Sequence, residues 1–414
     1  MIETQEKKQR ALLIGADYGK YDAEVSLDEL EELAETAGAE VVGKMLQKLP
    51  TVNNATYIGK GKLQEVKEFI SLHEIDLLVV DDELSGAQIR NIEEYTGVDV
   101  IDRTMLILDI FAQRARSNEG KLQVELAQQK YLLPRLLGMG KVLSRLGGGI
   151  GTRGPGETKL ESDRRHIRRR IESLEQELRG LEERRARMRE RRQKNDLLTV
   201  AIVGYTNVGK STLLNLLTDA GVLAKNQLFA TLDPTAREIS LPDGQTAILV
   251  DTVGLLRRLP HQLIQAFKST LEEAANADLI LNVCDISSDT VDEQLEVTQD
   301  LLNELGCGEI PTITVYNKAD LLSKDLEQPR NPRAVLISAK ENRGVDQLLE
   351  MMAEVLSSSI CRLTLCIPYA EGPLLDRIRR QGKIFSEEYL PEGVRVDANV
   401  DHKMLHLVET YRCN

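Results

Sequence analysis

The sequence predicts an α/β protein that is built from several domains. Apolar runs of strand length alternate with segments of helical periodicity over residues 10–112, and this alternation returns over residues 196–358. Between the two regions lies a highly charged stretch with helical spacing of its apolar residues. Alternating strands and helices are typical of mostly parallel sheets covered by helices. A chain of 414 residues can hold roughly two to four such domains.

The first predicted domain covers residues 1–112. Apolar runs at residues 11–15, 41–45, 77–80 and 98–101 predict four strands of a mostly parallel sheet. Helical patterns are interleaved with them at residues 27–37, 62–71, 87–95 and 105–115. The turn Gly59-Lys60-Gly61-Lys62 has a composition that can bind an anion at a helix start, although such a turn is more often a plain connection.

Residues 113–195 form the second predicted domain, an antiparallel helical hairpin. One helix is expected over residues 121–135, with a break near Pro134. A loop with six glycines between Gly147 and Gly156 follows, and it loses much entropy when it is ordered, so we expect a partner to order it. The long second helix has apolar residues near heptad spacing, interrupted by Arg164 and Arg185: Leu160, Ile167, Ile171, Leu174, Leu178, Leu181 and Met188.

Charge is distributed unevenly along the chain. The net charge is −13, yet residues 113–195 contain 22 basic and 11 acidic side chains. This asymmetry favours a basic arm that contacts a polyanion. In that case Arg145 and Arg153 are candidates to face RNA phosphates or to stack on bases without reading a base sequence. The alternative is a solvated helix face held by its own salt bridges.

The third predicted domain, residues 196–358, begins with a phosphate-binding loop. An apolar run over residues 197–203 precedes a glycine-rich loop, and a helical pattern follows, as such a loop requires. Backbone N–H groups would surround the phosphates, Lys210 would bridge the β- and γ-phosphates, and Ser211 would bind Mg²⁺. The predicted nucleotide contacts here are Gly204, Tyr205, Thr206, Asn207, Val208, Gly209, Lys210, Ser211 and Thr212.

Three later motifs each follow a predicted strand. Asp251 can hold a magnesium-bound water, and Gly254 lets a backbone N–H approach the γ-phosphate. An Asp320 carboxylate can accept two hydrogen bonds from guanine, a donor pair that adenine lacks, so GTP is favoured over ATP, and the Ala339 N–H is a candidate for guanine O6. The predicted contacts are Asp251, Thr252, Val253 and Gly254; Asn317, Lys318, Ala319 and Asp320; and Ser338, Ala339 and Lys340.

Between the first two motifs lies Phe229-Ala230-Thr231-Leu232-Asp233, a second predicted nucleotide contact. A mobile segment here usually supplies a hydroxyl to Mg²⁺ and closes over the γ-phosphate. Thr231 is the candidate, with Thr235 as its competitor. The predicted metal ligands are therefore Ser211, Thr231 and Asp251, and the predicted catalytic groups are Lys210, Thr231 and Gly254.

The last region, residues 359–414, predicts a small α+β domain. A strand is expected over residues 361–367, a helix over 374–384, and one or two strands within 394–407. The five cysteines show neither metal-ligand spacing nor an even disulfide framework, which favours a reducing cytosol, with Cys284 buried in a strand. The sequence has no run of 18 apolar residues and no hydrophobic targeting core at its start.

Several segments together resemble the HflX family of GTPases: residues 148–161 followed by Asp163-Arg164-Arg165, then residues 56–62, 229–235 and 251–254. The resemblance covers about residues 10–360. It implies a cytoplasmic GTPase that binds GTP and GDP and associates with the large ribosomal subunit and its RNA, with the glycine-arginine loop near the peptidyl-transferase centre. It further implies that the protein dissociates or rescues ribosomes under stress.

The sequence supports further predictions. We expect a monomer without DNA or integral membrane contact, found in the cytoplasm, at ribosomes or at the membrane periphery. The alternative function is an RNA-remodelling enzyme of helicase type that uses ATP, or a GTPase of ribosome assembly. Leu255 stands where many signalling GTPases carry the glutamine that positions water, so intrinsic hydrolysis should be slow. Asn207 suggests a K⁺ ion in addition to Mg²⁺, although asparagine also tolerates tight loops.

Overall fold

The computed structural model describes residues 8–136, 159–194, 198–218, 229, 235–252, 254–258, 274–322, 329, 331–357, 360–381, 384–401 and 404–413. Its residues fall into two compact units. Unit 1 comprises Met1–Leu181, Lys225–Asp233 and Leu256–Ser269, and unit 2 comprises Glu182–Ala224, Pro234–Leu255 and Thr270–Asn414. The domain bounds expected from the sequence stay a prediction.

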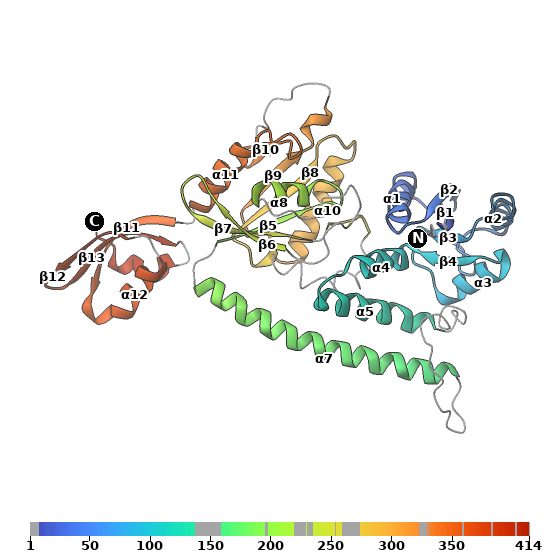
Figure 1. Cartoon of the computed structure of the whole chain (residues 1–414), viewed down its shortest axis with the longest axis horizontal. Coiled ribbons are helices and arrows are strands. Elements are labelled where there is room, and N and C mark those ends of the chain that lie inside the picture. Colours follow the sequence, from blue (N-terminus) through green and yellow to red (C-terminus); the bar gives the residue numbers. More distant parts are fainter. Residues whose placement is uncertain are drawn as a thin grey trace, which may run out of the picture. The chain divides into compact units, whose positions relative to one another are not determined.

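Unit 1 contains a parallel four-stranded sheet in the order β2-β1-β3-β4 (Figure 1). Its strands are β1 (Arg10–Asp17), β2 (Glu40–Lys48), β3 (Leu77–Val80) and β4 (Asp99–Asp102). The helices that alternate with them are α1 (Ala23–Thr36), α2 (Lys60–His73), α3 (Gly86–Thr96) and α4 (Arg103–Arg114). The predicted strands and helices of this region are confirmed. The central strands β1 and β3 are buried on both faces, as is typical of parallel sheets, whereas the edge strand β2 is half-buried.

A hydrophobic core joins this sheet to α2 and α3. Leu12, Leu78 and Val80 of the strands belong to one buried cluster with Val66 of α2 and Ile89 of α3. Ser85 caps α3 in a capping box with Gln88, and Asp102 caps α4 through the Met105 N–H. These caps fix the points at which the chain leaves the carboxyl ends of β3 and β4.

The predicted helical pair is also present. Helix α5 (Asn118–Leu132) ends in a short 3-10 turn at Leu133–Arg135, which contains Pro134, and α7 spans Lys159–Lys194. Figure 1 shows α5 and α7 side by side and running in opposite directions. Leu174 and Leu178 of the predicted seam are buried against Leu122. An ion pair between Arg170 and Glu125 flanks this contact, with Nε and Oε1 2.6 Å apart.

Unit 2 contains a six-stranded sheet in the order β10-β9-β8-β5-β7-β6. The strands are β5 (Leu198–Gly204), β6 (Thr235–Ser240), β7 (Thr246–Asp251), β8 (Leu279–Asp285), β9 (Thr312–Asn317) and β10 (Ala334–Leu336). Only the β6–β7 pair is antiparallel among the pairs described. The helices described here are α8 (Lys210–Thr218), α10 (Val291–Glu304) and α11 (Val345–Ser357). Cys284 is buried on β8, as expected.

The last part of unit 2 is an antiparallel sheet in the order β11-β13-β12, with α12 (Gly372–Gln381) packed on it. Its strands are β11 (Ile360–Pro368), β12 (Ile384–Leu390) and β13 (Gly393–Asp401). The prediction missed β12 and ended the helix too late, because only the pairing with β13 makes residues 384–390 extended. One strand, β13, lies in the range 394–407 where one or two were expected, and the end of that range is helical, in α13 (Leu405–Val408).

A disulfide between Cys366 and Cys413 corrects the prediction that the cysteines form no framework. The Cys413 N–H donates to the Thr364 carbonyl, at 2.8 Å, so the end of the chain lies beside β11. Forty-seven residues separate the two cysteines, and their proximity depends on this long-range pairing. Among the described residues, no helix is long and apolar enough to cross a membrane.

Candidate nucleotide site

The glycine-rich loop joins β5 to α8, as the sequence predicts. Gly204 has a φ of +147°, and a Cβ at this position would overlap the Val283 carbonyl oxygen on β8. Gly209 has a φ of +94°, and a Cβ there would overlap the side-chain amide of Asn317. Both positions therefore require glycine, and both keep the loop close to the carboxyl ends of the central strands.

Lys210 begins α8 and is only 7% exposed. Its ammonium donates to the carbonyl oxygens of Gly204 at 3.0 Å and Tyr205 at 2.6 Å. Burial lowers the pKa of Lys210 to about 8, although nearby Asp251 acts in the opposite direction. The lysine is thus held inside the loop, where an anionic phosphate would restore the stability of its charged form.

Ser211 and Asp251 bring a hydroxyl and a carboxylate together. Ser211 lies in the first turn of α8, Asp251 ends β7, and the serine Oγ donates to Asp251 Oδ2 at 2.9 Å. Thr252 is buried and donates through Oγ1 to the Ile202 carbonyl at 2.7 Å, which fixes the chain just after Asp251. Oxygen donors of these two kinds are the ligands that Mg²⁺ prefers.

The residues after Asp251 return to the phosphate loop. The Leu255 N–H donates to the Gly204 carbonyl at 3.1 Å, and the Thr206 N–H donates to the Leu255 carbonyl at 2.8 Å. The Leu255 side chain is a hydrocarbon and is buried, so it cannot position a water molecule. A Cβ on Gly254 would lie 3.2 Å from Lys210 Nζ, which places the Gly254 backbone against the lysine ammonium.

Asn317 links the other two motifs to the phosphate loop. Its Nδ2 donates to the Val208 carbonyl at 2.8 Å, and its Oδ1 accepts from the Ala339 N–H at 3.0 Å. The Ala339 N–H, which was predicted to contact guanine O6, therefore donates to Asn317 Oδ1 in this structure. Lys318 has a φ of +63° and forms an ion pair with Asp285 at 2.7 Å.

Asp320 lies in the 3-10 turn Ala319–Leu321 and is fixed by Ser338. The Ser338 hydroxyl donates to Asp320 Oδ1 at 2.6 Å and is fully buried. This hydrogen bond is the main reason that the pKa of Asp320 lies below its usual value. The group is an ionised acceptor at neutral pH, as a partner for the two guanine donors must be.

Some predicted residues lie outside the described part of the chain: Arg145, Arg153, Ala230, Thr231, Leu232, Asp233 and Val253. Phe229 is described, and its ring is only 2% exposed. It packs edge-to-face on Phe111 of α4, with ring centroids 4.5 Å apart. The Phe229 ring is thus turned into the protein, and its contact with a nucleotide stays a prediction.

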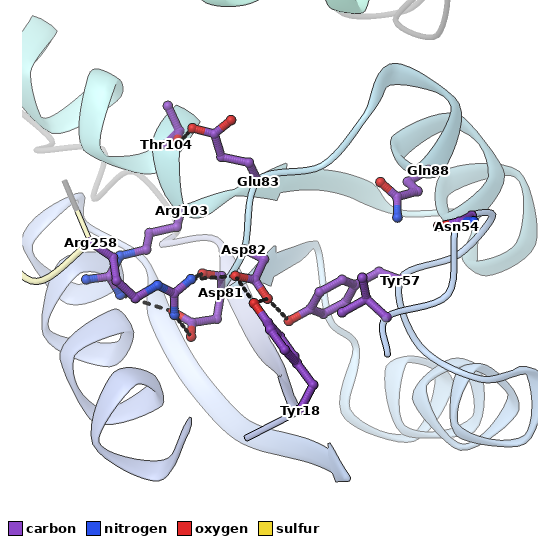
Figure 2. Close-up of a pocket in the computed structure, with 11 residues that line it drawn as sticks. Tyr18, Asn54, Tyr57, Asp81, Asp82, Glu83, Gln88, Arg103, Thr104 and Arg258 are labelled. Atoms are coloured by element: carbon purple, nitrogen blue, oxygen red, sulfur yellow. Dashed lines mark hydrogen bonds and ion pairs between the residues drawn. The ribbon is translucent and has the colours of Figure 1, made fainter. Parts of the chain in front are cut away.

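A second feature, a cavity of about 500 Å³ in unit 1, was not predicted from the sequence (Figure 2). It lies at the carboxyl ends of β1 and β3, and Asp81, Asp82 and Arg258 line it. The signal in the sequence is the run Asp81-Asp82-Glu83 directly after the buried strand β3. Its partner Arg258 could not be found from the sequence, because it lies 177 residues away from Asp81.

Comparisons with known proteins agree with this geometry. Three family models match successive parts of the chain: "GTP-binding GTPase N-terminal" over residues 24–112, "GTP-binding GTPase Middle Region" over 114–192, and "50S ribosome-binding GTPase" over 199–318. A solved structure of a GTP-binding protein from Sulfolobus solfataricus in complex with GDP is 27% identical, with a TM-score of 0.44. It covers 84% of this chain and 99% of that one, but at this TM-score it adds nothing to the assignment.

Curated relatives match over nearly the full length. The "GTPase HflX" of Caldanaerobacter subterraneus subsp. tengcongensis is 52% identical over 400 residues, which cover 97% of this chain and 93% of the relative. The "GTPase HflX" of Escherichia coli strain K12 is 41% identical over 405 residues, covering 97% and 95%. The nucleotide motifs, the three successive family models and these relatives lead to one conclusion: the chain belongs to the HflX family of GTPases.

Proposed function

We propose that this GTPase binds the large ribosomal subunit, which stimulates hydrolysis of GTP, and that the cycle dissociates or rescues ribosomes under stress. The family model described as "50S ribosome-binding GTPase" supports the choice of partner. Leu255 is the observation that makes us expect GTP hydrolysis to need a partner, because its apolar, buried side chain cannot orient the attacking water molecule. An activator is therefore expected to supply the missing stabilisation of the transition state.

The proposed chemistry of this chain is positioning. Lys210 holds the β- and γ-phosphates, the Gly254 N–H approaches the γ-phosphate, and Asp320 holds the guanine. Ser211 and Asp251 would hold Mg²⁺, with Thr231 as a further candidate ligand. When it is bound, Mg²⁺ neutralises charge on the phosphate oxygens. The K⁺ ion stays a prediction, because Asn207 has a φ of +61° and the tight loop alone accounts for asparagine there.

The basic hairpin is the proposed contact with ribosomal RNA. Many arginines of α7 are exposed along the described helix, whereas Arg170 is paired with Glu125. The alternative, a solvated helix face held by its own salt bridges, therefore accounts for part of the positive charge of α7. Arg145 and Arg153 in the glycine-rich loop remain the proposed contacts at the tip.

Co-sedimentation with purified large subunits tests this proposal. The protein is sedimented with GDP, with GTP and with a non-hydrolysable GTP analogue, each at two salt concentrations. We expect nucleotide-dependent association that falls steeply with salt, because each neutralised phosphate releases counterions. Arg153→Ala should weaken association with the subunit. It should also reduce, by about 1, the slope of the logarithm of the association constant against the logarithm of the salt concentration, while the affinity of the variant for free GTP stays unchanged. Arg90→Gln is the matched control, since Arg90 is an exposed arginine of α3.

Association that does not depend on nucleotide, salt or Arg153 would contradict the proposal. The alternative function, ATP-dependent RNA remodelling, has less support from unit 1. The cavity at the carboxyl ends of its strands carries Asp81, Asp82 and Glu83. Arg103 and Arg258 line the cavity too, so three carboxylates face two guanidinium groups, and the remaining negative charge does not favour a triphosphate such as ATP.

A further inference from the structure

The Cys366–Cys413 disulfide joins two segments of the antiparallel sheet region in unit 2. The two Cα atoms lie 6.0 Å apart, although 47 residues separate the cysteines in the sequence. Both residues are half-buried, whereas Cys284 and Cys307 are buried free thiols. Of the cysteines whose side chains the structure describes, this pair is therefore the more accessible to reagents in solution.

The disulfide fastens residues 409–413 to an edge strand. Strand β11 lies at one edge of the sheet β11-β13-β12, and it pairs with β13 along its whole length (Figure 1). The Cys413 N–H donates to the Thr364 carbonyl of β11 at 2.8 Å, and Arg412 forms an antiparallel bridge with Leu365. Because β13 occupies the inner side of β11, these contacts cover its outer side.

The other contacts described for residues 409–413 hold this segment weakly. Val408, just before it, is fully buried in the core that the sheet forms with α12, so the chain is anchored up to that residue. After it, Glu409, Thr410 and Arg412 are exposed, and Tyr411 is only partly buried. Segments with few buried apolar contacts open locally at little cost in free energy. Breaking the disulfide would therefore free residues 409–413 and leave the core of the sheet in place.

The chemical setting of the disulfide favours a reversible bond over a permanent one. Disulfides that only stabilise a fold are typical of secreted proteins, whereas disulfides in a reducing cytosol are usually transient and respond to the redox state. A protein that binds ribosomes works in such a reducing environment, so this step rests on the function proposed above. A disulfide outside the core is also the kind that small thiols reduce, because access to the sulfur controls the exchange.

We propose that Cys366 and Cys413 are a site of reversible thiol–disulfide exchange that fastens and releases residues 409–413. In the oxidising direction, the thiolate of one cysteine attacks a low-molecular-weight disulfide, which releases one small thiol. The thiolate of the other cysteine then attacks the mixed disulfide and releases the second small thiol. The two protein thiols lose two electrons and two protons, and the small disulfide gains them. An excess of the small thiol drives the same steps in reverse.

Release of this segment uncovers the outer side of β11. The Thr364 carbonyl then loses the hydrogen bond from Cys413. Unpaired backbone groups of an edge strand are free to pair with another extended segment. The redox state of the two cysteines therefore controls whether this edge of the sheet is covered.

The redox equilibrium of the unmodified full chain is the first test. The protein is equilibrated with reduced and oxidised glutathione over a wide range of ratios, free thiols are blocked with iodoacetamide, and each cysteine is assigned by peptide mass spectrometry. We expect Cys366 and Cys413 to change together from thiols to a disulfide, within the range of glutathione ratios found in cells. A pair that stays oxidised at the most reducing ratio, or never oxidises, would overturn the proposal.

Hydrogen exchange, followed by mass spectrometry, tests what the disulfide holds in place. Amides of residues 409–413 should exchange about 30-fold faster or more in the reduced protein, a factor that corresponds to the lower end of typical disulfide stabilisation. Cys413→Ser should show the fast exchange in both redox buffers, because it cannot form the bond. Cys361→Ser changes another cysteine of β11, and as the matched control it should keep the difference between the buffers.

Equal exchange in the oxidised and reduced proteins would also overturn the proposal, since residues 409–413 would then be held without the bond. The Cys413 side chain is only half-buried, so Cys413→Ser should fold, and its affinity for GDP checks this. Ribosomes are absent from both measurements. A failure of this proposal is therefore distinguishable from a failure of the proposed ribosome contact.

Discussion

Lys210 shows how burial prepares a single side chain for an anionic ligand. Its ammonium is enclosed by backbone carbonyls, and burial lowers its pKa from 10.5 to about 8. The folded state therefore binds fewer protons than the unfolded state between about pH 8 and pH 10.5. The cost to stability is fully present below pH 8 and disappears as the pH rises through this window.

The same shift predicts how nucleotide binding depends on pH. A bound phosphate stabilises the charged lysine, so binding of GDP should take up a proton near pH 8. The affinity should fall above pH 8, by at most about tenfold per pH unit. Calorimetric titrations at pH 8 in two buffers of different ionisation enthalpy measure this uptake directly. Equal heats in both buffers would show that Lys210 is fully protonated before nucleotide binds.

Asp320 provides a second prediction at this scale. Asp320→Asn should weaken GTP binding by roughly 100-fold or more, because the guanine donors would face an amide N–H. The same change should favour xanthosine nucleotides, whose C2 carbonyl can accept from that amide. Competition between GTP and xanthosine triphosphate measures the switch, and the gain for xanthosine is the control for correct folding. If GTP and ATP bind equally to the unmodified protein, the guanine assignment is wrong.

At the scale of elements, the turn from β5 into α8 depends on glycine. Gly204→Ala should destabilise unit 2 by about 1–3 kcal/mol, because a Cβ would overlap a carbonyl of β8. Gly180→Ala is the matched control: Gly180 lies within α7, where a Cβ would meet nothing within 4 Å. It should instead stabilise the helix by about 0.5–1 kcal/mol. Thermal unfolding should show shifts of opposite sign, and a shared sign would contradict the account.

Local elements were predictable where local chemistry determines them. The four strands of unit 1 and the loop between β5 and α8 follow from apolar runs and from glycine at fixed spacing. Strand β12 could not be predicted, since Glu387 and Glu388 interrupt its alternation and only pairing with β13 defines it. The Asp81–Arg258 contact and the Cys366–Cys413 disulfide join distant segments, and a local pattern contains no information about such pairs.

At the scale of the whole molecule, the nucleotide site is predicted to need help from outside the chain. Lys210, Ser211, Asp251 and Asp320 are the groups proposed to bind and orient GTP, but the apolar, buried Leu255 gives the attacking water no positioning side chain.

The steady-state rate of GTP hydrolysis, with and without purified large ribosomal subunits, tests this account most directly. Slow turnover by the protein alone and a strong increase with the subunit are the expected results. Activators that supply a missing catalytic group raise rates by about 10³–10⁵ in related systems, so the increase should be plain. Fast turnover without ribosomes that stays the same when large subunits are added would contradict the central claim that the ribosome completes this active site.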